Sequence, residues 1–272
     1  MHRRDSDISR ADSPVAIAIG GHDPTSGAGV VADAAVMAAL GVHPLTVVTG
    51  LTEQDSAGVA AMVAADAGFV RRVLDRIARD FDIAAAKIGM LASIEVAREV
   101  AAWIDEWRAS RARETAALVL DPVVLASDGR SLLAGYERGV LARLVAQATI
   151  VTPNLNEAAL LTGVDVGTAA GCGDAARALL DAGASAVLIK GGHAEGAPVD
   201  RLYTRDGERT WRWEREGETP HGTGCAVASA IAANLALGRD MEGAVDEALT
   251  FVQERIRRAM GLGRGRSIMR LR

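Results

Sequence analysis

Ala85-Ala86-Lys87-Ile88 is a short, mostly apolar run that is followed by an amphipathic stretch over residues 94–111 and a second apolar run, Ala117-Leu118-Val119-Leu120. Both runs have the length of a buried strand, and the stretch between them has the length and the periodicity of a helix. A strand, a helix and a strand in this order predict two parallel strands joined by a helix that covers the sheet.

The same alternation continues in both directions along the chain. Further strands are predicted at residues 15–19, 45–49, 149–151 and 186–189, and further helices at residues 29–40, 67–80, 133–147 and 169–181. After Lys190 the pattern changes to a hairpin, residues 201–204 and 209–213 around Asp206-Gly207, and two last helices at residues 223–237 and 241–260. The pattern therefore predicts an α/β fold with three layers, α/β/α, around a mostly parallel central sheet.

The composition indicates a globular protein. The chain has 272 residues, of which 49% are hydrophobic and 24% are charged, and we found no linker or repeat that divides it. We therefore predict a flexible extension over residues 1–13, a single domain over residues 14–260 and a C-terminal tail over residues 261–272.

Charge and cysteine content exclude several classes of partner. The formal net charge is -5 and only 3% of the residues are aromatic, which argues against binding of nucleic acid. The apolar run at residues 15–19 is too short for a membrane span or a signal peptide. Two distant cysteines, Cys172 and Cys225, build no disulfide framework or zinc site. We expect a reduced, cytoplasmic protein that binds neither nucleic acid nor membrane.

The segment Thr219-Pro220-His221-Gly222-Thr223-Gly224-Cys225 precedes an alanine-rich apolar run. A helix that begins directly after glycines presents unpaired N–H groups and the positive end of its dipole, which is the physics of an anion site. Cys225 then lies at the helix N-terminus, where we expect its pKa to fall. The alternative interpretation is a tight turn capped by Thr223, with an inert cysteine.

Polar residues also follow three of the predicted strands. Asp121 ends one strand and Glu157 follows the next, and the two carboxylates suit Mg²⁺ held partly through waters. Lys190 ends a third strand before two glycines and suits a point charge over phosphate oxygens. The alternatives are a turn-forming Asp121, a helix capped by Asn156 with Glu157 in its first turn, and a solvated Lys190. No GxxxxGK[ST] motif occurs, so a P-loop kinase is not expected.

With these loops in this order, the chain resembles the hydroxymethylpyrimidine/phosphomethylpyrimidine kinases of thiamine biosynthesis, within the ribokinase-like superfamily. The resemblance spans about residues 15–258. The matching blocks are residues 20–33, residues 41–59 with Leu51-Thr52-Glu53-Gln54-Asp55, Lys87-Ile88-Gly89-Met90-Leu91, Asp121-Pro122-Val123, Thr152-Pro153-Asn154 with Glu157, Lys190-Gly191-Gly192-His193, and residues 221–225.

The resemblance implies a ribokinase-like domain, usually a homodimer, that phosphorylates 4-amino-5-hydroxymethyl-2-methylpyrimidine with ATP and Mg²⁺ and then phosphorylates the monophosphate. It implies that Cys225 activates the substrate hydroxyl and that Gly222, Thr223 and Gly224 form an anion hole. The remaining implied roles are ATP binding by Lys190 and Asn154 together with Thr223 and Gly224, magnesium binding by Asp121 and Glu157, and pyrimidine binding by Gly21, Asp33, Gln54, Met90 and Val123.

The sequence also departs from the family's pattern near the substrate loops. His22 replaces the usual serine of the first loop, Glu53 and Asp55 flank Gln54 in place of Ala and Asn, and Leu249 replaces a common lysine. Two alternatives stay open: a pyridoxal-type vitamin kinase of the same superfamily, which Cys225 in place of aspartate disfavours, and a non-catalytic pyrimidine-binding regulatory protein.

Overall fold

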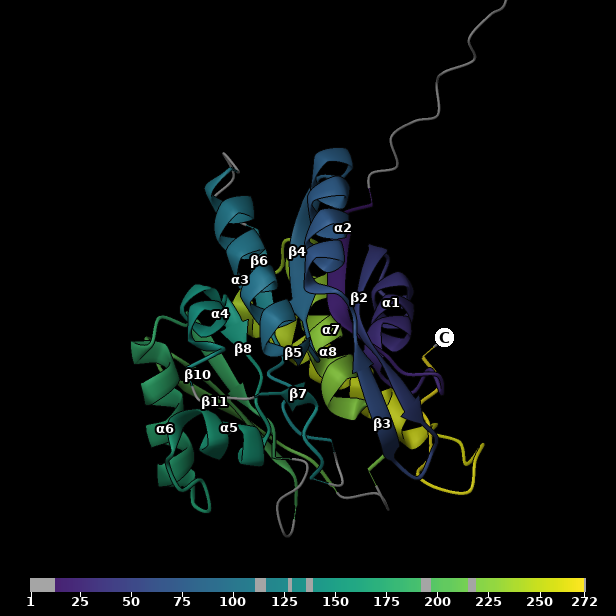
Figure 1. The fold of residues 1–272 in the computed structure, drawn as a ribbon. Helices are drawn as coiled ribbons and strands as arrows, with labels where there is room; N and C mark the ends of the chain where they lie inside the picture. The colour runs from purple at the N-terminus through teal and green to yellow at the C-terminus, as the bar shows by residue number, and fades with distance from the viewer. Residues whose placement is uncertain are drawn as a thin grey trace, which may run out of the picture.

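The computed structural model describes residues 13–110, 116–126, 129–135, 139–191, 197–214 and 219–271. Within these residues, nine strands form one sheet in the order β11-β10-β9-β8-β6-β4-β1-β2-β3 (Figure 1). These strands are β1 (Val15–His22), β2 (His43–Gln54), β3 (Val59–Ala64), β4 (Ile83–Ile88), β6 (Ala117–Leu120), β8 (Ile150–Val151), β9 (Ala186–Ile189), β10 (Val199–Thr204) and β11 (Glu208–Arg212).

The centre of this sheet is parallel, and its two edges are antiparallel. Strands β2, β1, β4, β6, β8 and β9 pair in parallel, whereas β3 pairs antiparallel with β2, and β10 pairs antiparallel with β9 and β11. The helices are α1 (Gly29–Ala39), α2 (Ala67–Asp80), α3 (Ile94–Ala109), α4 (Ala142–Gln147), α5 (Leu155–Thr162), α6 (Ala169–Asp181), α7 (Thr223–Ala236) and α8 (Met241–Arg257). The predicted α/β class and the mostly parallel sheet are confirmed.

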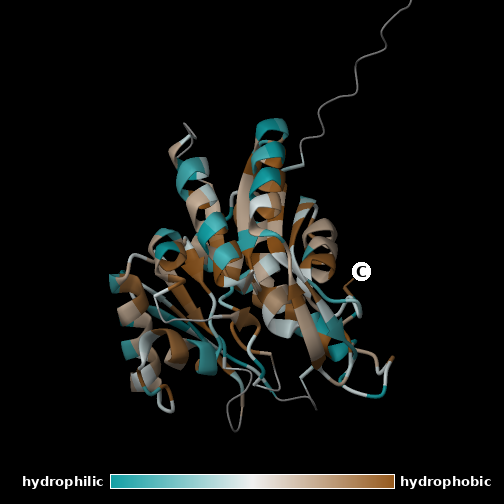
Figure 2. Cartoon of the chain, viewed as in Figure 1, coloured by the Kyte–Doolittle hydropathy of each residue, from teal (hydrophilic) through white to brown (hydrophobic). Residues whose placement is uncertain are grey.

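Alternating side chains of each central strand divide the interior into two cores. In β1, Ile17 and Ile19 belong to one core, while Ala16 and Ala18 belong to the other. Helices α2 to α6 supply the first core, and α1, α7 and α8 supply the second. Figure 2 shows the brown, hydrophobic strands between helices whose outward faces are teal. The burial of both faces explains why these strands read as continuous apolar runs.

One predicted helix is wrong, and three strands, β3, β5 (Ala92–Ser93) and β7 (Leu133–Ala134), were not predicted. Residues 133–147 were expected to form a single helix, but the first two of them form strand β7, which pairs with β5. Gly135 follows with φ +74°, a left-handed conformation that interrupts a helix, and α4 begins only at Ala142. Strand β3 carries few large side chains on its exposed face, so its sequence lacked a clear strand signal.

The segment that was expected to be a C-terminal tail packs onto the domain. Met269 and Leu271 are buried in the second core with α7 and α8. Met260 and Ile268 form an antiparallel bridge, and Ile268 also pairs with His221. The predicted N-terminal extension over residues 1–13 lies, except for Ser13, outside the described residues.

No helix in the described part of the chain combines the length and the apolar character that a membrane crossing requires.

Candidate active site

A pocket of about 480 Å³ opens at the carboxyl ends of the parallel strands, where open α/β sheets bind their ligands. The loops that follow the strands form its wall, together with the start of α7 and one residue of the C-terminal segment. All of the predicted site residues line it: Gly21, Asp33, Gln54, Met90, Asp121, Val123, Asn154, Glu157, Lys190, Gly222, Thr223, Gly224 and Cys225.

The first turn of α7 forms one end of the pocket. Its N-cap residue is Gly222, with φ +80° and no side-chain cap. A Cβ atom at Gly222 would lie 1.8 Å from the carbonyl oxygen of Gly27, so only glycine lets these two loops touch. Thr223 does not cap the helix, because its hydroxyl donates to the carbonyl oxygen of Pro220. The N–H groups of the first turn are therefore left for a ligand, as an anion site requires.

Lys190 and Asp121 lie beside this turn. The Lys190 ammonium group is 2.7 Å from Asp121 Oδ1 and would lie 3.0 Å from a Cβ atom at Gly224. Burial raises the pKa of Asp121, but the positive charges of Lys190 and Lys87 outweigh it and hold the pKa below its usual value. A fixed cation thus lies directly at the N-terminus of α7, next to a charged carboxylate.

Asn154 and Glu157 form a capping box at the start of α5. The Asn154 side chain accepts from the Glu157 N–H at 2.9 Å, and Glu157 Oε2 accepts from the Asn154 N–H at 2.8 Å. The expectation that Asn156 caps this helix is wrong, since the chain enters the helix two residues earlier. Burial raises the pKa of Glu157 to about 7, with Lys190 opposing the shift. Glu157 is thus a carboxyl group that titrates near neutrality in the unliganded protein.

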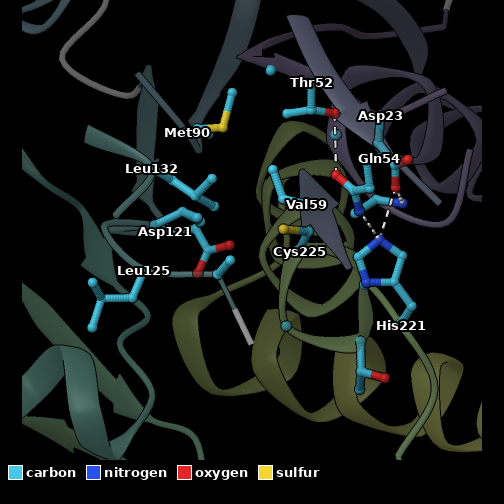
Figure 3. A pocket seen from close by; sticks show the side chains of 18 of the residues that line it. Asp23, Thr52, Gln54, Val59, Met90, Asp121, Leu125, Leu132, His221 and Cys225 are labelled. Atoms are coloured by element: carbon cyan, nitrogen blue, oxygen red, sulfur yellow. Dashed lines mark hydrogen bonds and ion pairs between the residues drawn. The ribbon is translucent and has the colours of Figure 1, made fainter. Parts of the chain in front are cut away.

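Cys225 occupies the third position of α7, and its thiol differs from our expectation. Burial raises its pKa to about 12; Lys87 and Lys190 lower the pKa, while Asp121 and Asp33 raise it further. The prediction of a lowered thiol pKa is therefore wrong for the unliganded protein. The helix dipole and two lysines are outweighed because the sulfur has left water and faces two carboxylates. Cys225 nevertheless lines the same pocket as Asp121 and Lys190, and Figure 3 shows its sulfur among the labelled side chains of that pocket.

A second ion pair lies under the pocket floor. Lys87 Nζ is 2.8 Å from Asp33 Oδ2, and the Ser229 hydroxyl donates to Asp33 Oδ1 at 2.6 Å. These three side chains are at most 1% exposed. Burial lowers the pKa of Lys87, but Asp33 and then Cys225 and Asp121 reverse this effect and keep the lysine charged. Asp33 thus reaches the pocket with both oxygens already bonded.

Polar side chains from three loops meet on the opposite wall (Figure 3). His221 Nε2 is 2.8 Å from Asp23 Oδ2 and 2.9 Å from the side-chain amide of Gln54. Thr52 Oγ1 lies 3.1 Å from Gln54 Oε1 on the same strand. Burial raises the pKa of Asp23, but hydrogen bonds from His221 and Thr25 outweigh this and lower it. The network ties the first loop, strand β2 and the α7 loop together.

An apolar surface completes the pocket. Met90 packs in a small cluster with Val59 and Leu132, against which the half-buried Val123 lies. Gly21 faces this cluster, and a Cβ atom there would lie 2.1 Å from the Met90 methyl group. The pocket thus has an apolar surface at Met90 and Val123 and a polar group at Gln54, the combination that small-molecule sites commonly show.

Asp23, Lys87, His221 and Arg266 also line the pocket, and none of them was assigned a role from the sequence, although the first three stand in the matching blocks. Lys87 carried a usable signal, because a lysine inside an otherwise apolar strand predicts a buried ion pair. Arg266 carried none, since a residue in an irregular segment gives no indication of where that segment packs. Gly192 and His193, which were part of the Lys190 block, lie outside the described residues.

The comparisons with known proteins agree with this geometry. The family model described as phosphomethylpyrimidine kinase matches residues 23–270. The chain belongs to the phosphomethylpyrimidine kinase family. A hydroxymethylpyrimidine/phosphomethylpyrimidine kinase of Streptomyces coelicolor is 38% identical over 93% of this chain and 92% of its own length. The predicted family, its kinase class and the ribokinase-like fold are thereby confirmed.

Among solved structures, the chain is similar to a phosphomethylpyrimidine kinase and to a pyridoxal kinase. A phosphomethylpyrimidine kinase of Clostridium difficile superimposes with a TM-score of 0.78 and 29% identity, over 89% of this chain and 99% of that chain. A Bacillus subtilis pyridoxal kinase in complex with ADP superimposes with a TM-score of 0.84 and 26% identity, over 95% and 97%. The phosphomethylpyrimidine kinase fold is thus shared with a vitamin kinase that binds a nucleotide.

Proposed function

We propose that this protein transfers the γ-phosphoryl group of ATP to the hydroxymethyl group of 4-amino-5-hydroxymethyl-2-methylpyrimidine, and then to the phosphate of the product. One observation carries the proposal: Cys225 and the open first turn of α7 share one pocket with Lys190, Asp121 and an apolar wall. The names of the curated relatives support the same substrate and its monophosphate.

In this proposal the α7 turn and Lys190 hold the phosphates of ATP. The N–H groups of Gly222, Thr223 and Gly224 stabilise the charge on the γ-phosphoryl oxygens as it develops. The substrate oxygen forms its bond to the γ-phosphorus while the bond to the leaving ADP oxygen breaks. Asn154 lies on the same wall and contributes to the nucleotide side of the pocket.

Cys225 is the proposed acceptor of the substrate's hydroxyl proton. Only the thiolate form of Cys225 can accept this proton, because the neutral thiol already carries one. The pKa of about 12 makes that form a small fraction at pH 7, and it returns to the thiol when the substrate's proton is transferred. The loose transition state of phosphoryl transfer releases the hydroxyl proton late, when bond formation has made that proton acidic. Such a step needs a correctly placed acceptor more than a strong one.

Asp121 and Glu157 are the proposed residues for Mg²⁺. The donor set fits this ion, because both are buried carboxylates, Asp121 directly after β6 and Glu157 in the first turn of α5, and magnesium takes few protein oxygens besides waters and phosphates. When bound there, Mg²⁺ would neutralise charge on the transferring phosphoryl group. Until then, Lys190 supplies the positive charge that Asp121 requires.

The pyrimidine ring is proposed to lie between Met90 and Val123 on one side and Gln54 on the other. Gly21 leaves room for the Met90 methyl group at this wall, and Asp33 presents a carboxylate at the floor. Asp55, a departure from the family pattern, accepts from the N–H groups of its own turn at Ala57 and Gly58. Its charge is therefore engaged in that turn.

We further propose that the protein works as a cytoplasmic homodimer. The edge strand β3 and the adjoining end of β2 expose two large apolar side chains, Leu51 at 57% and Val63 at 69%. An exposed edge strand with apolar side chains favours pairing with another chain. Sedimentation of the wild type and of Val63→Lys tests this, with a monomeric wild type as the contradicting result.

A second candidate is phosphorylation of pyridoxal. It is favoured by the TM-score of 0.84 with the Bacillus subtilis pyridoxal kinase, which exceeds the 0.78 with the phosphomethylpyrimidine kinase of Clostridium difficile. The two candidates share the phosphoryl chemistry and differ only in the ring that the apolar wall must accept.

The decisive experiment measures ADP release with the pyrimidine alcohol, its monophosphate and pyridoxal as separate acceptors. We expect turnover with the first two, and a fall of about 10²- to 10⁴-fold in kcat for Cys225→Ala, since a positioned proton acceptor is worth about that much. Cys172→Ala is the matched control, because Cys172 is buried in the first core, away from the pocket. Turnover with pyridoxal alone would favour the second candidate, and ligand binding without turnover would favour a regulatory protein.

A further inference from the structure

The C-terminal segment over residues 260–271, here called the C-terminal strap, is anchored at both ends. Met260 and Ile268 exchange backbone hydrogen bonds of 2.9 and 3.0 Å, which close residues 261–267 into a loop. Beyond it, Met269 and Leu271 are buried against α7 and α8. A segment held in this way presents its middle residues in a fixed position.

The middle of the strap holds the loop that precedes α7. The Arg266 guanidinium group donates to the carbonyl oxygen of Thr219 from Nε at 3.2 Å and from Nη2 at 2.7 Å, and Nη2 also lies 3.2 Å from that of Pro220. The His221 N–H donates to the carbonyl oxygen of Ser267 at 2.9 Å. Three consecutive residues before the N-cap of α7 are thus bonded to two consecutive residues of the strap.

Arg266 and its neighbour Gly265 also hold the turn between β2 and β3. The Arg266 N–H donates to the carbonyl oxygen of Ser56 at 2.8 Å, and the Gly265 N–H donates to Ser56 Oγ at 3.0 Å. A Cβ atom at Gly265 would lie 2.2 Å from the Ser56 carbonyl oxygen, so the contact is close. The strap therefore connects two walls of the pocket, one of which carries Gln54.

These contacts matter because phosphoryl transfer depends on position. The amide groups of the α7 turn stabilise a developing charge only if they point at it, and a displacement of about 1 Å costs about 10²-fold in rate. Pro220 has no N–H group, so it cannot donate a backbone hydrogen bond to hold this loop. Nε and Nη2 of Arg266 are directed at carbonyl oxygens of the loop, so these donors hold backbone rather than phosphate.

We propose that Arg266 is a positioning residue for phosphoryl transfer, which acts by holding the Thr219–His221 backbone and, through the strap, the turn at Ser56 in place. The proposal rests on the proposed kinase function for its effect on rate. The predicted effect of Arg266 on the Thr219–His221 loop is independent of the kinase function and can be measured separately.

The experiment compares Arg266→Ala with Arg264→Ala, an exposed arginine of the same strap. We expect Arg266→Ala to lower kcat with the pyrimidine alcohol about 10- to 100-fold and to change its KM less than about threefold, since the pocket floor is untouched. Arg266→Lys should recover part of kcat, because an ammonium group can donate to one of the two carbonyl oxygens. Arg264→Ala should match the wild type.

Hydrogen exchange gives a readout that does not depend on substrate. The amides of His221 and Ala226 are bonded in the wild type, and we expect the peptide that contains them to exchange about tenfold faster in Arg266→Ala than in Arg264→Ala. If the wild type turns over none of the acceptors, the proposed function fails, and hydrogen exchange still decides the role of the strap.

Two results would overturn the proposal: exchange in this peptide that is equal in both variants, or a kcat for Arg266→Ala within about twofold of the control. If Arg266→Ala does not fold, Arg266→Lys and Ser56→Ala carry the test. Ser56→Ala removes only the side-chain acceptor of Gly265, and we expect a fall of about two- to fivefold in kcat with an unchanged melting temperature.

Discussion

Two buried ion pairs lie under the same pocket, and they differ in what else touches them. The pair of Lys87 and Asp33 is closed, meaning that water does not reach it: its side chains are 1% and 0% exposed. The Ser229 hydroxyl donates a hydrogen bond to the second oxygen of the Asp33 carboxylate. The pair of Lys190 and Asp121 is open: Lys190 is 11% exposed and faces the pocket at the start of α7. Both have the same chemistry and nearly the same length, 2.8 and 2.7 Å.

The difference indicates two tasks. Removing Lys87 from the closed pair would leave a charge without a partner in the interior, so we assign this pair to holding β4, α1 and α7 together beneath the pyrimidine that Asp33 is proposed to face. An open pair can exchange one partner for a ligand from the pocket, so we assign it to handling phosphate. The predictions below test this division of roles.

The largest expected effect is a loss of stability when the closed pair is broken. Lys87→Met leaves the Asp33 carboxylate buried without its cation, and we expect a loss of about 3 to 5 kcal/mol in the free energy of unfolding, measured by urea denaturation. The double variant Lys87→Met/Asp33→Asn should recover about half of this loss, because no unpaired charge remains. A loss below about 1 kcal/mol for Lys87→Met would contradict a closed, structural pair.

Breaking the open pair should lower kcat strongly and the free energy of unfolding only slightly. Lys190→Met removes the cation at the α7 turn, and we expect kcat to fall about 10²-fold or more while the free energy of unfolding falls by only about 1 kcal/mol. The smaller loss of stability follows from the contact that Asp121 keeps with the Thr152 hydroxyl, at 3.3 Å, and from the remaining positive charge of Lys87, which also lowers the pKa of Asp121. A stability loss as large as that of Lys87→Met would remove the distinction between the pairs.

The third prediction concerns Glu157, which faces the open pair. Its folded-state pKa of about 7 lies above its ordinary value of 4.5, so its ionisation destabilises the folded state progressively as the pH rises through this interval. With a metal chelator present, Glu157→Gln should therefore be more stable than the wild type at pH 8 by about 2 kcal/mol. The difference should vanish below pH 4.5, where the carboxyl group is neutral in both states. Equal stability at pH 8 would argue against a raised pKa.

The smallest effect is expected for a change at Ser229, whose hydroxyl donates to the Asp33 carboxylate of the closed pair. Ser229→Ala removes a donor to Asp33 but leaves Lys87 in place, so we expect a loss of about 1 to 2 kcal/mol in unfolding free energy and a kcat within about threefold of the wild type. Calorimetry and the turnover assay measure both quantities. A fall in kcat as large as that of Lys190→Met would place Ser229 in the phosphoryl chemistry instead.

The positions of most site residues could be predicted because they follow parallel strands. Asp121 and Lys190 come directly after an apolar run, Asn154 follows one after Thr152 and Pro153, and the carboxyl ends of parallel strands meet at one edge of the sheet. Short apolar runs and glycine-rich helix starts are local patterns, so the sequence shows them without any knowledge of packing. The family resemblance then connected these loops to a kinase.

The partners of these residues could not be predicted in the same way. The Lys87–Asp33 contact joins residues 54 positions apart, and Ser229 is 196 positions from Asp33. The C-terminal strap gave no periodic signal, and its apolar anchors, Met269 and Leu271, are separated from the rest of the core by an irregular segment. The expectation for Cys225 was wrong because it counted the helix dipole and neglected burial.

The alternation of apolar runs, amphipathic stretches and glycine loops, read from the chain alone, determined the fold class, the kinase family and the edge of the sheet where the site lies, because these depend on local periodicity and on the order of loops. The tertiary structure alone decided the protonation of Cys225 and Glu157, the closed pair beneath them and the attachment of Arg266 to the α7 loop. A pKa or a hydrogen bond depends on distance and on the exclusion of water, and both arise only when distant segments pack together.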